Sequence, residues 1–523
     1  EPSQGPCVRQ TDRRAQMASA ASTGPPGQGG EELSEDAASP SSTENESGSE
    51  GGSPNSEDAG AVKALLTELV PSSPEILRAT SAAVPLERFG LLLRQVAGGA
   101  VARGDSRDQY SRSFNTTHFD EFWSHSWHGP GWEKVLTLLI FYNAPPAVAV
   151  SSAAAFAGAS LQFWAPSSRP EVAALMSFCP AFLGFFLTLT LWRSGRRVFL
   201  DSICICQADK SLKKQGIMSL GGFLRHSKSM LILWDPSYCG RLWCVFEQAA
   251  FYFLQTQDPS KNVYVRPTCQ VSCALIVMLC VCLRVIGSLS VSSMMGLSAV
   301  VQASSMFVLM LVMAPALRRI ARGVADLSET IGSFTMDRAK CFCCSHDHCH
   351  PITGEELACD RVLVEASVQE WFGSIEHFVD FVRTDLNRRF VAQCNNPYRI
   401  AVLWTVPHLW WKLGKAAHLL STGRAQLALK CACMGLLMVF LAWPCLLELF
   451  FLLATALRAR SAGGLANAGR NALLASVMFA FQEGLWLAAH KTEHARLTWP
   501  LLCSAGAGLS ALTALTYGRR VFH

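Results

Sequence analysis

The sequence predicts a mixed fold class: a multi-pass α-helical membrane protein of seven or eight spans that carries an α/β domain split by a membrane hairpin. Three observations support this prediction. Half of the 523 residues are hydrophobic and 16% are charged, whereas soluble domains have roughly 25% charged residues. Apolar runs of about 20 residues recur, which is the length that a helix needs to cross a bilayer. Strand-like and helix-like segments alternate on both sides of the first pair of runs.

The apolar runs predict seven transmembrane helices, at residues 147–164, 172–192, 268–286, 294–317, 431–457, 472–489 and 497–517. An eighth run, residues 400–413, is short, contains Pro407 and is rich in tryptophan, so the alternative is a segment lying in the membrane interface. The runs group into one transmembrane hairpin at 147–192, a second at 268–317 and a C-terminal transmembrane bundle at 400–517. The lipid bilayer is therefore an expected partner.

Basic clusters predict the orientation of the chain. "RSGRR" follows the second apolar run and "RRIAR" follows the fourth. Because Lys and Arg collect on the cytoplasmic side of a membrane, we expect the α/β domain and the polar segment 318–396 to face the cytosol. Asn115 begins the glycosylation sequon "NTT", which stays unmodified in this orientation.

Three ionisable residues fall inside the apolar runs: Arg284, Glu448 and Glu483. Charges in a membrane are costly and often belong to transport or coupling sites, so they support a channel or transporter as one alternative. Arg284 is near the end of its run, where its side chain can also reach the interface.

A disordered acidic tail is predicted for the first 60 residues. Positions 15–62 contain nine acidic residues, no Lys or Arg, and few large apolar side chains, so they cannot bury enough surface to offset the entropy of ordering. Residues 61–104 are expected to form short amphipathic helices. The 20 cysteines lie in apolar runs or in segments expected in the cytosol, which favours reduced thiols over a secreted disulfide framework.

The α/β domain is predicted at residues 119–142 and 196–266. Expected strands are residues 119–124, 198–201, 230–234 and 262–265, and expected helices begin near 132, 212 and 241. This alternation predicts a parallel, doubly wound sheet. The hairpin at 147–192 divides the domain after its first helix.

Several motifs in this domain resemble the Toll/interleukin-1 receptor/resistance (TIR) family. They are "FDEFWS" at 119–124, "FLD" at 199–201, Ser227 or Ser229 before the run "MLILW", Tyr238, and "WCVFE" at 243–247. The likeness covers roughly a quarter of the chain. Arg241 replaces the serine that usually stands two residues before the Trp, and no fifth strand follows the fourth. The whole chain also resembles multi-pass membrane proteins predicted from dinoflagellate algae, a likeness that implies no mechanism.

The resemblance implies a flavodoxin-like fold, a role in signal transduction, and a catalytic Glu247 that handles the ribose of NAD. Trp243, Ser124 and Asp201 would then bind NAD, the substrate, and catalysis would require no metal or cofactor. A fixed carboxylate suits cleavage of a nicotinamide–ribose bond, because the transition state carries positive charge. The alternative is that Trp243 and Phe246 belong to the core and Glu247 caps or solvates a helix.

The segment 318–396 is rich in Cys and His between two stretches with helical periodicity. Thiolates and imidazoles at such spacing suit a structural zinc ion. The candidate ligands are Cys341, Cys344, His346, His348, Cys349 and Cys359. The pattern matches no standard zinc finger, and the alternative is a loop of reduced thiols. We expect the two amphipathic helices to pack on the α/β domain or on each other.

Three functions remain open from the sequence. The first is a membrane-bound TIR-like NAD hydrolase, and the second is a non-catalytic adaptor that self-associates into a homo-oligomer through its TIR-like surface. The third is a channel or transporter with a regulatory cytosolic domain. The sequence has no P-loop, HExxH motif or nucleophile elbow, and no nucleic-acid-binding motif.

Overall fold

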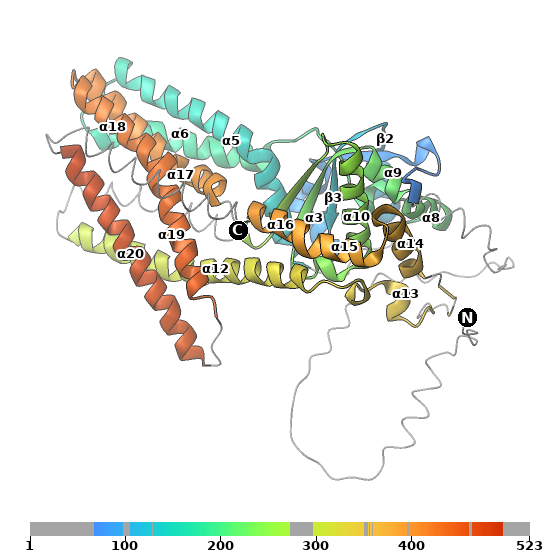
Figure 1. Ribbon diagram of the computed structural model, residues 1–523. Coiled ribbons are helices and arrows are strands. Elements are labelled where there is room, and N and C mark those ends of the chain that lie inside the picture. The colour runs from blue at the N-terminus through green and yellow to red at the C-terminus, as the bar shows by residue number, and fades with distance from the viewer. Residues whose placement is uncertain are drawn as a thin grey trace, which may run out of the picture.

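The computed structural model describes residues 67–97, 105–127, 129–271, 297–349, 359–394, 397–459 and 463–494, together with positions 354, 356 and 357. The predicted acidic tail and the predicted span 497–517 lie outside these residues, and so does nearly all of the span 268–286. Figure 1 shows an α/β unit at one end of the molecule and long helices at the other.

A six-stranded sheet in the order β2-β1-β4-β3-β5-β6 forms the centre of the α/β unit. The four parallel strands occupy the predicted positions, although their ends differ by a few residues. They are β3 (Phe119–His125), β4 (Arg197–Phe199), β5 (Ser227–Trp234) and β6 (Asn262–Pro267). Valine, isoleucine and aromatic side chains make these segments good strand formers, and a parallel sheet covered on both faces tolerates continuous apolar runs.

Two further strands make the sheet mixed rather than purely parallel. β1 (Arg78–Ser81) pairs antiparallel with β4, and β2 (Phe114–Asn115) pairs antiparallel with β1. β1 lies within residues 61–104, where short amphipathic helices were expected. It has four residues, too few to show a strand period in the sequence, and its pairing partner is more than 100 residues away.

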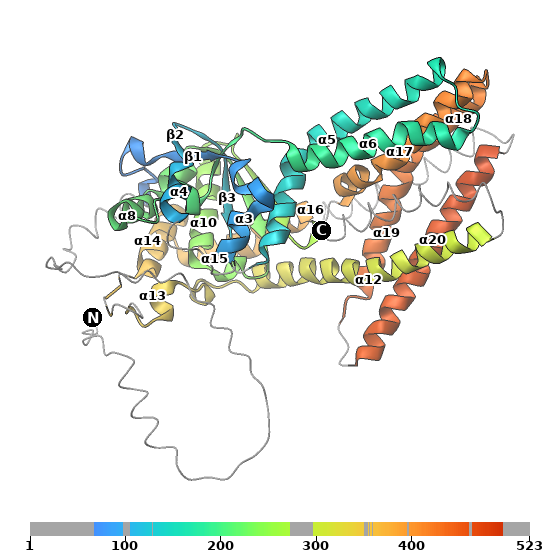
Figure 2. The ribbon, with the colours of Figure 1, turned by 180° about the vertical axis from the view of Figure 1, so that it is seen from behind.

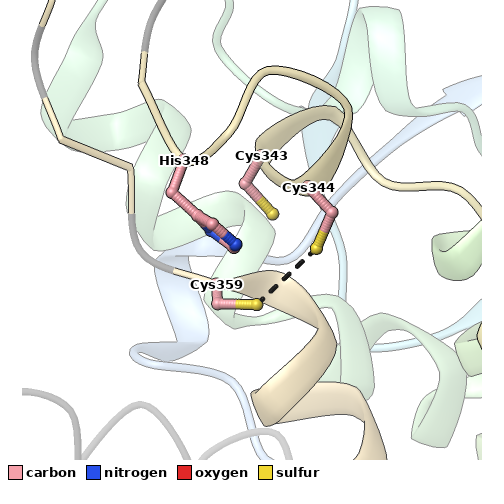
Figure 3. Close-up of side chains that lie close together, drawn as sticks. All are labelled: Cys343, Cys344, His348 and Cys359. Carbon is pink, nitrogen blue, oxygen red and sulfur yellow. Dashed lines mark hydrogen bonds between the residues drawn. The ribbon is translucent and has the colours of Figure 1, made fainter. Parts of the chain in front are cut away.

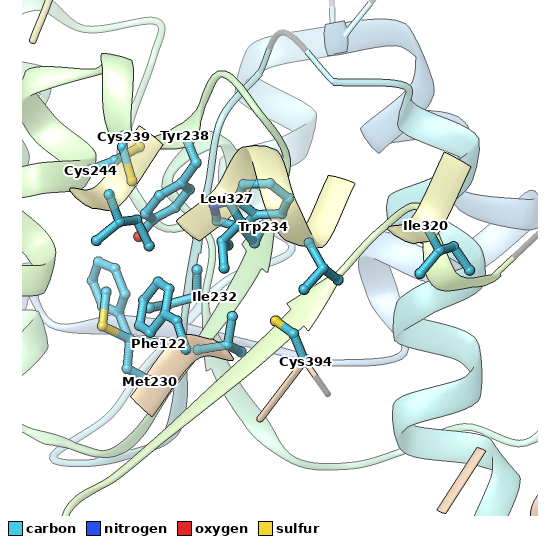
Figure 4. Close-up of a cluster of buried hydrophobic side chains, with 14 of the residues drawn as sticks. Phe122, Met230, Ile232, Trp234, Tyr238, Cys239, Cys244, Ile320, Leu327 and Cys394 are labelled. Atoms are coloured by element: carbon cyan, nitrogen blue, oxygen red, sulfur yellow. The ribbon is translucent and has the colours of Figure 1, made fainter. Parts of the chain in front are cut away.

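Helices cover both faces of the sheet, and alternate residues of β5 face opposite sides. Met230, Ile232 and Trp234 belong to the larger apolar core, whereas Leu231 and Leu233 belong to the smaller one (Figure 4). The α/β unit also contains the helices α3 (Glu87–Ala97), α8 (Lys210–Met218), α9 (Leu220–Arg225) and α10 (Leu242–Gln257). The expected single helix near 212–226 is therefore two helices, divided at Ser219.

The outer edge of β6 is covered by a side chain instead of a fifth parallel strand. The side-chain amide of Gln393, on α16 (Asn387–Cys394), donates to the carbonyl of Val263 at 3.0 Å. Its oxygen accepts from the amide of Val265 at 2.8 Å. These two bonds imitate one step of strand pairing, so backbone groups at the sheet edge are satisfied where the described strands end.

Two long helices connect the α/β unit to the rest of the molecule. The helix after β3 and the first predicted span are one helix, α5 (Gly131–Trp164), which contains Pro145 and Pro146. Figure 2 shows its first turns beside the sheet and the remainder running along α6 (Pro170–Leu191). Likewise, α12 (Leu297–Gly332) joins a predicted span to the first amphipathic stretch of segment 318–396. Near its end Leu327 is buried in the same core as Trp234 (Figure 4).

Among the described residues, four helices are long and apolar enough to cross a membrane: Gly131–Trp164, Pro170–Leu191, Ala303–Gly332 and Ala425–Ala456. These contain the predicted span 147–164, the spans 172–192 and 431–457 except for their last residue, and residues 303–317 of the span 294–317. The predicted span 472–489 lies in α20 (Gly464–His494), and the eighth run lies in α17 (Pro397–Ser421). Both form helices, but neither is among the four.

The helical end of the molecule is built by close packing of apolar helices. α17 contacts α5 and α6, where Phe178 stacks edge-on against Trp411 and Phe185 tilts against Trp410. Gly414 allows the backbones to approach, because a Cβ there would lie 2.4 Å from the carbonyl oxygen of Ala173. The other helices of this end are α18 (Ala425–Leu437), a π-helical turn (Met438–Ala442), α19 (Trp443–Ala456) and α20.

The second amphipathic stretch of segment 318–396 folds against the α/β unit. It forms α14 (Asp360–Phe372), α15 (Ile375–Phe381) and a π-helical turn (Val382–Leu386). Trp371 of α14 packs on Phe246 and Phe253 of α10, with ring centroids 5.5 and 5.7 Å apart. The expectation that this stretch packs on the α/β domain is therefore confirmed.

Candidate functional site

A cluster of polar side chains gathers where the parallel strands end. β3 ends at His125, α7 (Asp201–Cys204) begins two residues after β4, and Asp235 follows β5 directly. The carboxyl ends of parallel strands share one edge of a sheet, and ligands of open α/β sheets bind at that edge, where the strand order reverses. After β3 the chain forms β4 on one side of it and then β5 on the other, so β3 and β5 flank a point where the strand order reverses.

Ser124 and Glu247 are in direct contact at this edge. The buried hydroxyl of Ser124, on β3, donates to a carboxylate oxygen of Glu247, on α10. The hydroxyl of Tyr238, in the turn after β5, contacts the same Ser124 oxygen. Since Ser124 has one proton and gives it to Glu247, Tyr238 is the donor in the second bond. Three elements that are distant in the sequence therefore form one hydrogen-bonded chain.

Glu247 has a strongly perturbed acidity. Removal of the carboxylate from water raises its pKa to about 8. The hydrogen bond from Ser124 and the charge of Arg241 lower the pKa, while the charge of Asp201 raises it. The side chain is partly exposed, and near neutral pH it holds a proton that an ordinary glutamate would have lost.

Asp201 is a second carboxyl group in the same cluster. It begins α7, and it accepts hydrogen bonds from the indole of Trp127 at 3.1 Å and from the backbone amide of Ser202 at 2.7 Å. Burial raises its pKa, and the two hydrogen bonds together with the charges of Arg241 and Lys134 oppose that rise. It acts on Glu247 through its charge, which raises the pKa of that carboxyl group.

Cationic groups and a neutral histidine complete the cluster. Burial lowers the pKa of His125 well below its ordinary value, and the charges of Lys134 and Arg241 lower it further. The ammonium of Lys134 donates to the carbonyl of Ser126. His125 is therefore an uncharged donor and acceptor at neutral pH.

Two buried atoms of the cluster have no hydrogen-bond partner among the described residues. They are Nε2 of His125 and Oδ2 of Asp235. The other oxygen of Asp235 accepts from the backbone amide of Ser237 at 2.9 Å. Buried polar atoms in native proteins are nearly always paired, so these two atoms mark where water or a bound molecule completes the network.

The structure brings together three of the four predicted NAD-contacting residues. Ser124 and Glu247 are bonded, and Asp201 lies within reach of Glu247 through its charge. Trp243 instead donates its indole proton to Asp360 of α14 at 3.2 Å and packs edge-on against Phe246. These contacts place the indole of Trp243 toward α14 and not in the polar cluster around Glu247.

Sequence reasoning missed several members of the cluster. Tyr238 stands in the motif that suggested the TIR family, yet its contact with Ser124 requires the fold. His125 and Asp235 come directly after the predicted strands 119–124 and 230–234. A polar residue at the end of a parallel strand was therefore the signal that could have identified them. No sequence signal pointed to Lys134, because it belongs to a helix whose packing against the sheet edge cannot be inferred from the sequence.

A separate group of thiols and one imidazole lies beside the start of α14. The ligand atoms of Cys343, Cys344, His348 and Cys359 are all within 4.8 Å of one another (Figure 3). Three of the six predicted metal ligands, Cys344, His348 and Cys359, are therefore in this group.

The remaining three predicted ligands are not in the group, and Cys343 joins in place of Cys341. Cys341 is buried, and its sulfur lies 3.4 Å from the sulfur of Cys343. The two side chains differ in position because Cys341 is the N-cap of α13 (Phe342–Ser345), whereas Cys343 lies within the helix. His346 turns back to the carbonyl of Phe342 at 3.0 Å and is exposed. Cys349 is disulfide-bonded, which removes it as a ligand, whereas 14 described cysteines are free thiols.

The fold and the sites define a class. In the part of the chain that the structure describes, this is a mostly helical protein with four helices of membrane-spanning character, a mixed six-stranded sheet and a Cys/His group able to hold a metal ion. In comparisons with known proteins, no family model, no curated protein and no solved structure matches the chain.

Proposed function

We propose that this chain is a multi-pass membrane signalling protein whose TIR-like α/β unit cleaves NAD at the nicotinamide–ribose bond. The order of its parallel strands, β4-β3-β5-β6, supports a flavodoxin-like arrangement in which the first strand lies between the second and the third. The unit faces the cytosol, as the basic clusters after two spans predict.

The observation that carries this proposal is the position of Glu247. Its carboxyl group comes from the helix after the third parallel strand and meets Ser124 at the carboxyl end of the first. The site is thus where open α/β sheets bind nucleotides. The raised pKa is typical of functional carboxyl groups in partly dry surroundings.

The chemistry requires few groups. The bond between ribose C1′ and the nicotinamide nitrogen breaks, and its electron pair leaves with neutral nicotinamide. Water adds to C1′ and releases a proton, so the products are nicotinamide, ADP-ribose and H⁺. An ionised Glu247 stabilises positive charge developing on the ribose and accepts a bond from a ribose hydroxyl. The unpaired atoms of His125 and Asp235 supply further polar contacts.

The test is nicotinamide release from NAD by the purified full chain in detergent. We expect Glu247→Gln to lower the rate by at least about 100-fold, within the range typical for loss of one electrostatic group. Asp258→Asn is the control, because this exposed carboxylate lies just beyond the other end of α10. Equal rates for the wild type and Glu247→Gln would exclude the enzymatic function.

A non-catalytic adaptor is the second candidate, and one observation favours it. Ser124, which also contacts Tyr238, already donates to Glu247, and Trp243 is turned toward α14. The pair of Ser124 and Glu247 can therefore serve to hold α10 on the sheet. An adaptor would self-associate into a homo-oligomer through its α/β unit. Concentration-dependent self-association that persists in Glu247→Gln, with no NAD turnover by the wild type, would establish this function instead.

A further inference from the structure

The group Cys343, Cys344, His348 and Cys359 has the dimensions of a tetrahedral metal centre. Zinc–sulfur bonds of about 2.3 Å in tetrahedral geometry place two sulfurs about 3.8 Å apart. The sulfurs of Cys344 and Cys359 are 3.8 Å apart. Figure 3 shows the three thiols and the imidazole pointing toward a common centre. Three cysteines and one histidine form a common closed ligand set of structural zinc sites.

The backbone that carries His348 is held in an unfavourable conformation. Asp347 and His348 both have positive φ, 50° and 59°, and neither is glycine. Left-handed geometry is unfavourable for residues other than glycine and persists when other interactions require it. The turn brings the amide of His348 to the carbonyl of Cys343 at 2.8 Å and returns the imidazole to the thiols. A metal bound by the imidazole and the thiols would supply such an interaction.

Hydrogen-bond donors surround the thiols, as they do around zinc-bound thiolates. The backbone amide of Asp360 donates to the sulfur of Cys343 at 3.4 Å. The charged guanidinium of Arg361 lies near the thiol of Cys344. Three thiolates and one Zn²⁺ together carry one negative charge, which Arg361 balances. Such outer groups orient the ligands and retain the metal.

The same residues connect this group to the beginning of α10. Arg361 donates to the carbonyls of Met336 and Ala339, at 2.8 and 2.6 Å. The next residue, Lys340, bonds to Gly240 and Leu242 through its backbone, at 2.8 and 3.0 Å. On the other side Asp360 accepts from Trp243 of α10. Both flanks of the thiol group are thus attached to the first turn of the helix that carries Glu247.

We propose that Cys343, Cys344, His348 and Cys359 bind one zinc ion, and that this structural centre holds α13 and the start of α14 against the N-terminal turn of α10. The ion closes a loop between Cys344 and Cys359, and it fixes Asp360 and Arg361 where they contact Trp243 and residues 336–340. The centre requires neither NAD nor catalysis, so it stands apart from the proposed activity.

The test is the metal content of the full chain, purified in detergent under reducing conditions and measured by mass spectrometry. We expect about one zinc per chain in the wild type. Cys344→Ser and Cys359→Ser should each lower the zinc content at least about tenfold, within the loss typical of a missing ligand. Cys341→Ser is the matched control, because this neighbouring buried thiol is outside the group, and it should retain zinc.

Cobalt substitution provides a second measurement that does not depend on the variants. The wild type should give the intense visible bands of tetrahedral cobalt bound by three thiolates, and zinc should displace them. Removal of zinc by a strong chelator should increase protease cleavage between residues 340 and 360 and change the fluorescence of Trp243. A metal-free wild type with reduced thiols would overturn the proposal. Loss of zinc from Cys341→Ser but not from Cys344→Ser would overturn the ligand set.

Discussion

Glu133 of α5 and Arg319 of α12 form an ion pair of 2.9 Å at the point where two long helices leave the α/β unit. Glu133 is 2% exposed, and its second oxygen accepts from the hydroxyl of Thr268 at 3.2 Å, just after β6. Both helices contain a candidate membrane span. This contact therefore joins these two helices to each other and to the end of the sheet.

Arg319→Gln is expected to destabilise the protein, because it leaves the buried carboxylate of Glu133 without its cation. The expected loss is about 1–3 kcal/mol, read as a lower melting temperature in detergent. Glu133→Gln combined with Arg319→Gln removes both charges and should recover most of that loss. If the double variant melts as low as Arg319→Gln, the pair is not the cause.

The stability of the wild type should fall as pH rises, because of Glu247. Unfolded, this carboxyl group titrates near its ordinary pKa of 4.5, whereas its pKa in the fold is about 8. Between these values the folded chain retains a proton that the unfolded chain has lost, so stability decreases with pH and levels off above about 8. Glu247→Gln has no carboxyl group at this position and therefore lacks this pH-dependent loss of stability. Its melting temperature relative to the wild type should therefore increase from pH 4.5 to pH 8, and a constant difference would contradict the prediction.

Ser124→Ala should raise the pKa of Glu247 further, because the hydrogen bond from Ser124 lowers that pKa. If NAD cleavage requires the ionised carboxylate, the rate of the wild type rises with pH through about 8, and the midpoint in Ser124→Ala lies higher. The measurement is nicotinamide release as a function of pH. Ser211→Ala, an exposed change on α8, should leave the midpoint unchanged.

Trp371→Ala should loosen the packing of α14 on α10. The indole stacks on Phe246 and Phe253 and donates to the carbonyl of Thr67 at 2.8 Å, so truncation leaves a large cavity. The expected loss is about 3–5 kcal/mol, seen as faster limited proteolysis of residues 359–394. Val362→Ala on the same helix is the control, since Val362 is 63% exposed. Equal proteolysis of both variants would show that the indole does not hold α14.

The orientation of the α/β unit can be tested at Asn115. This residue lies in the edge strand β2, is exposed, and accepts from Arg78 at 2.7 Å through its side-chain oxygen. Its sequon is accessible to glycosylation if the unit enters a secretory lumen. In eukaryotic cells we expect no mass shift after deglycosylation. A glycan at Asn115 would reverse the orientation.

The sequence by itself determined the elements whose signals are local. Apolar runs identified four helices that the structure shows to be long enough to cross a membrane, and strand-like runs located β3 to β6 within a few residues. Hydrophobic length and composition decide these features within one segment. The same applies to the Cys/His segment, where the residue types alone suggested a metal site.

The tertiary structure decided which residues meet. β1 and β2 form strands only because β4 offers a free edge, and Gln393 satisfies the opposite edge from a helix 128 residues beyond Val265. Cys343 replaces Cys341 in the thiol group because the turn of α13 sets the direction of each side chain. Trp243 and Glu247 lie one helical turn apart, yet α14 draws the first toward Asp360 while β3 holds the second at Ser124. Such pairings depend on long-range packing, which local sequence patterns do not contain.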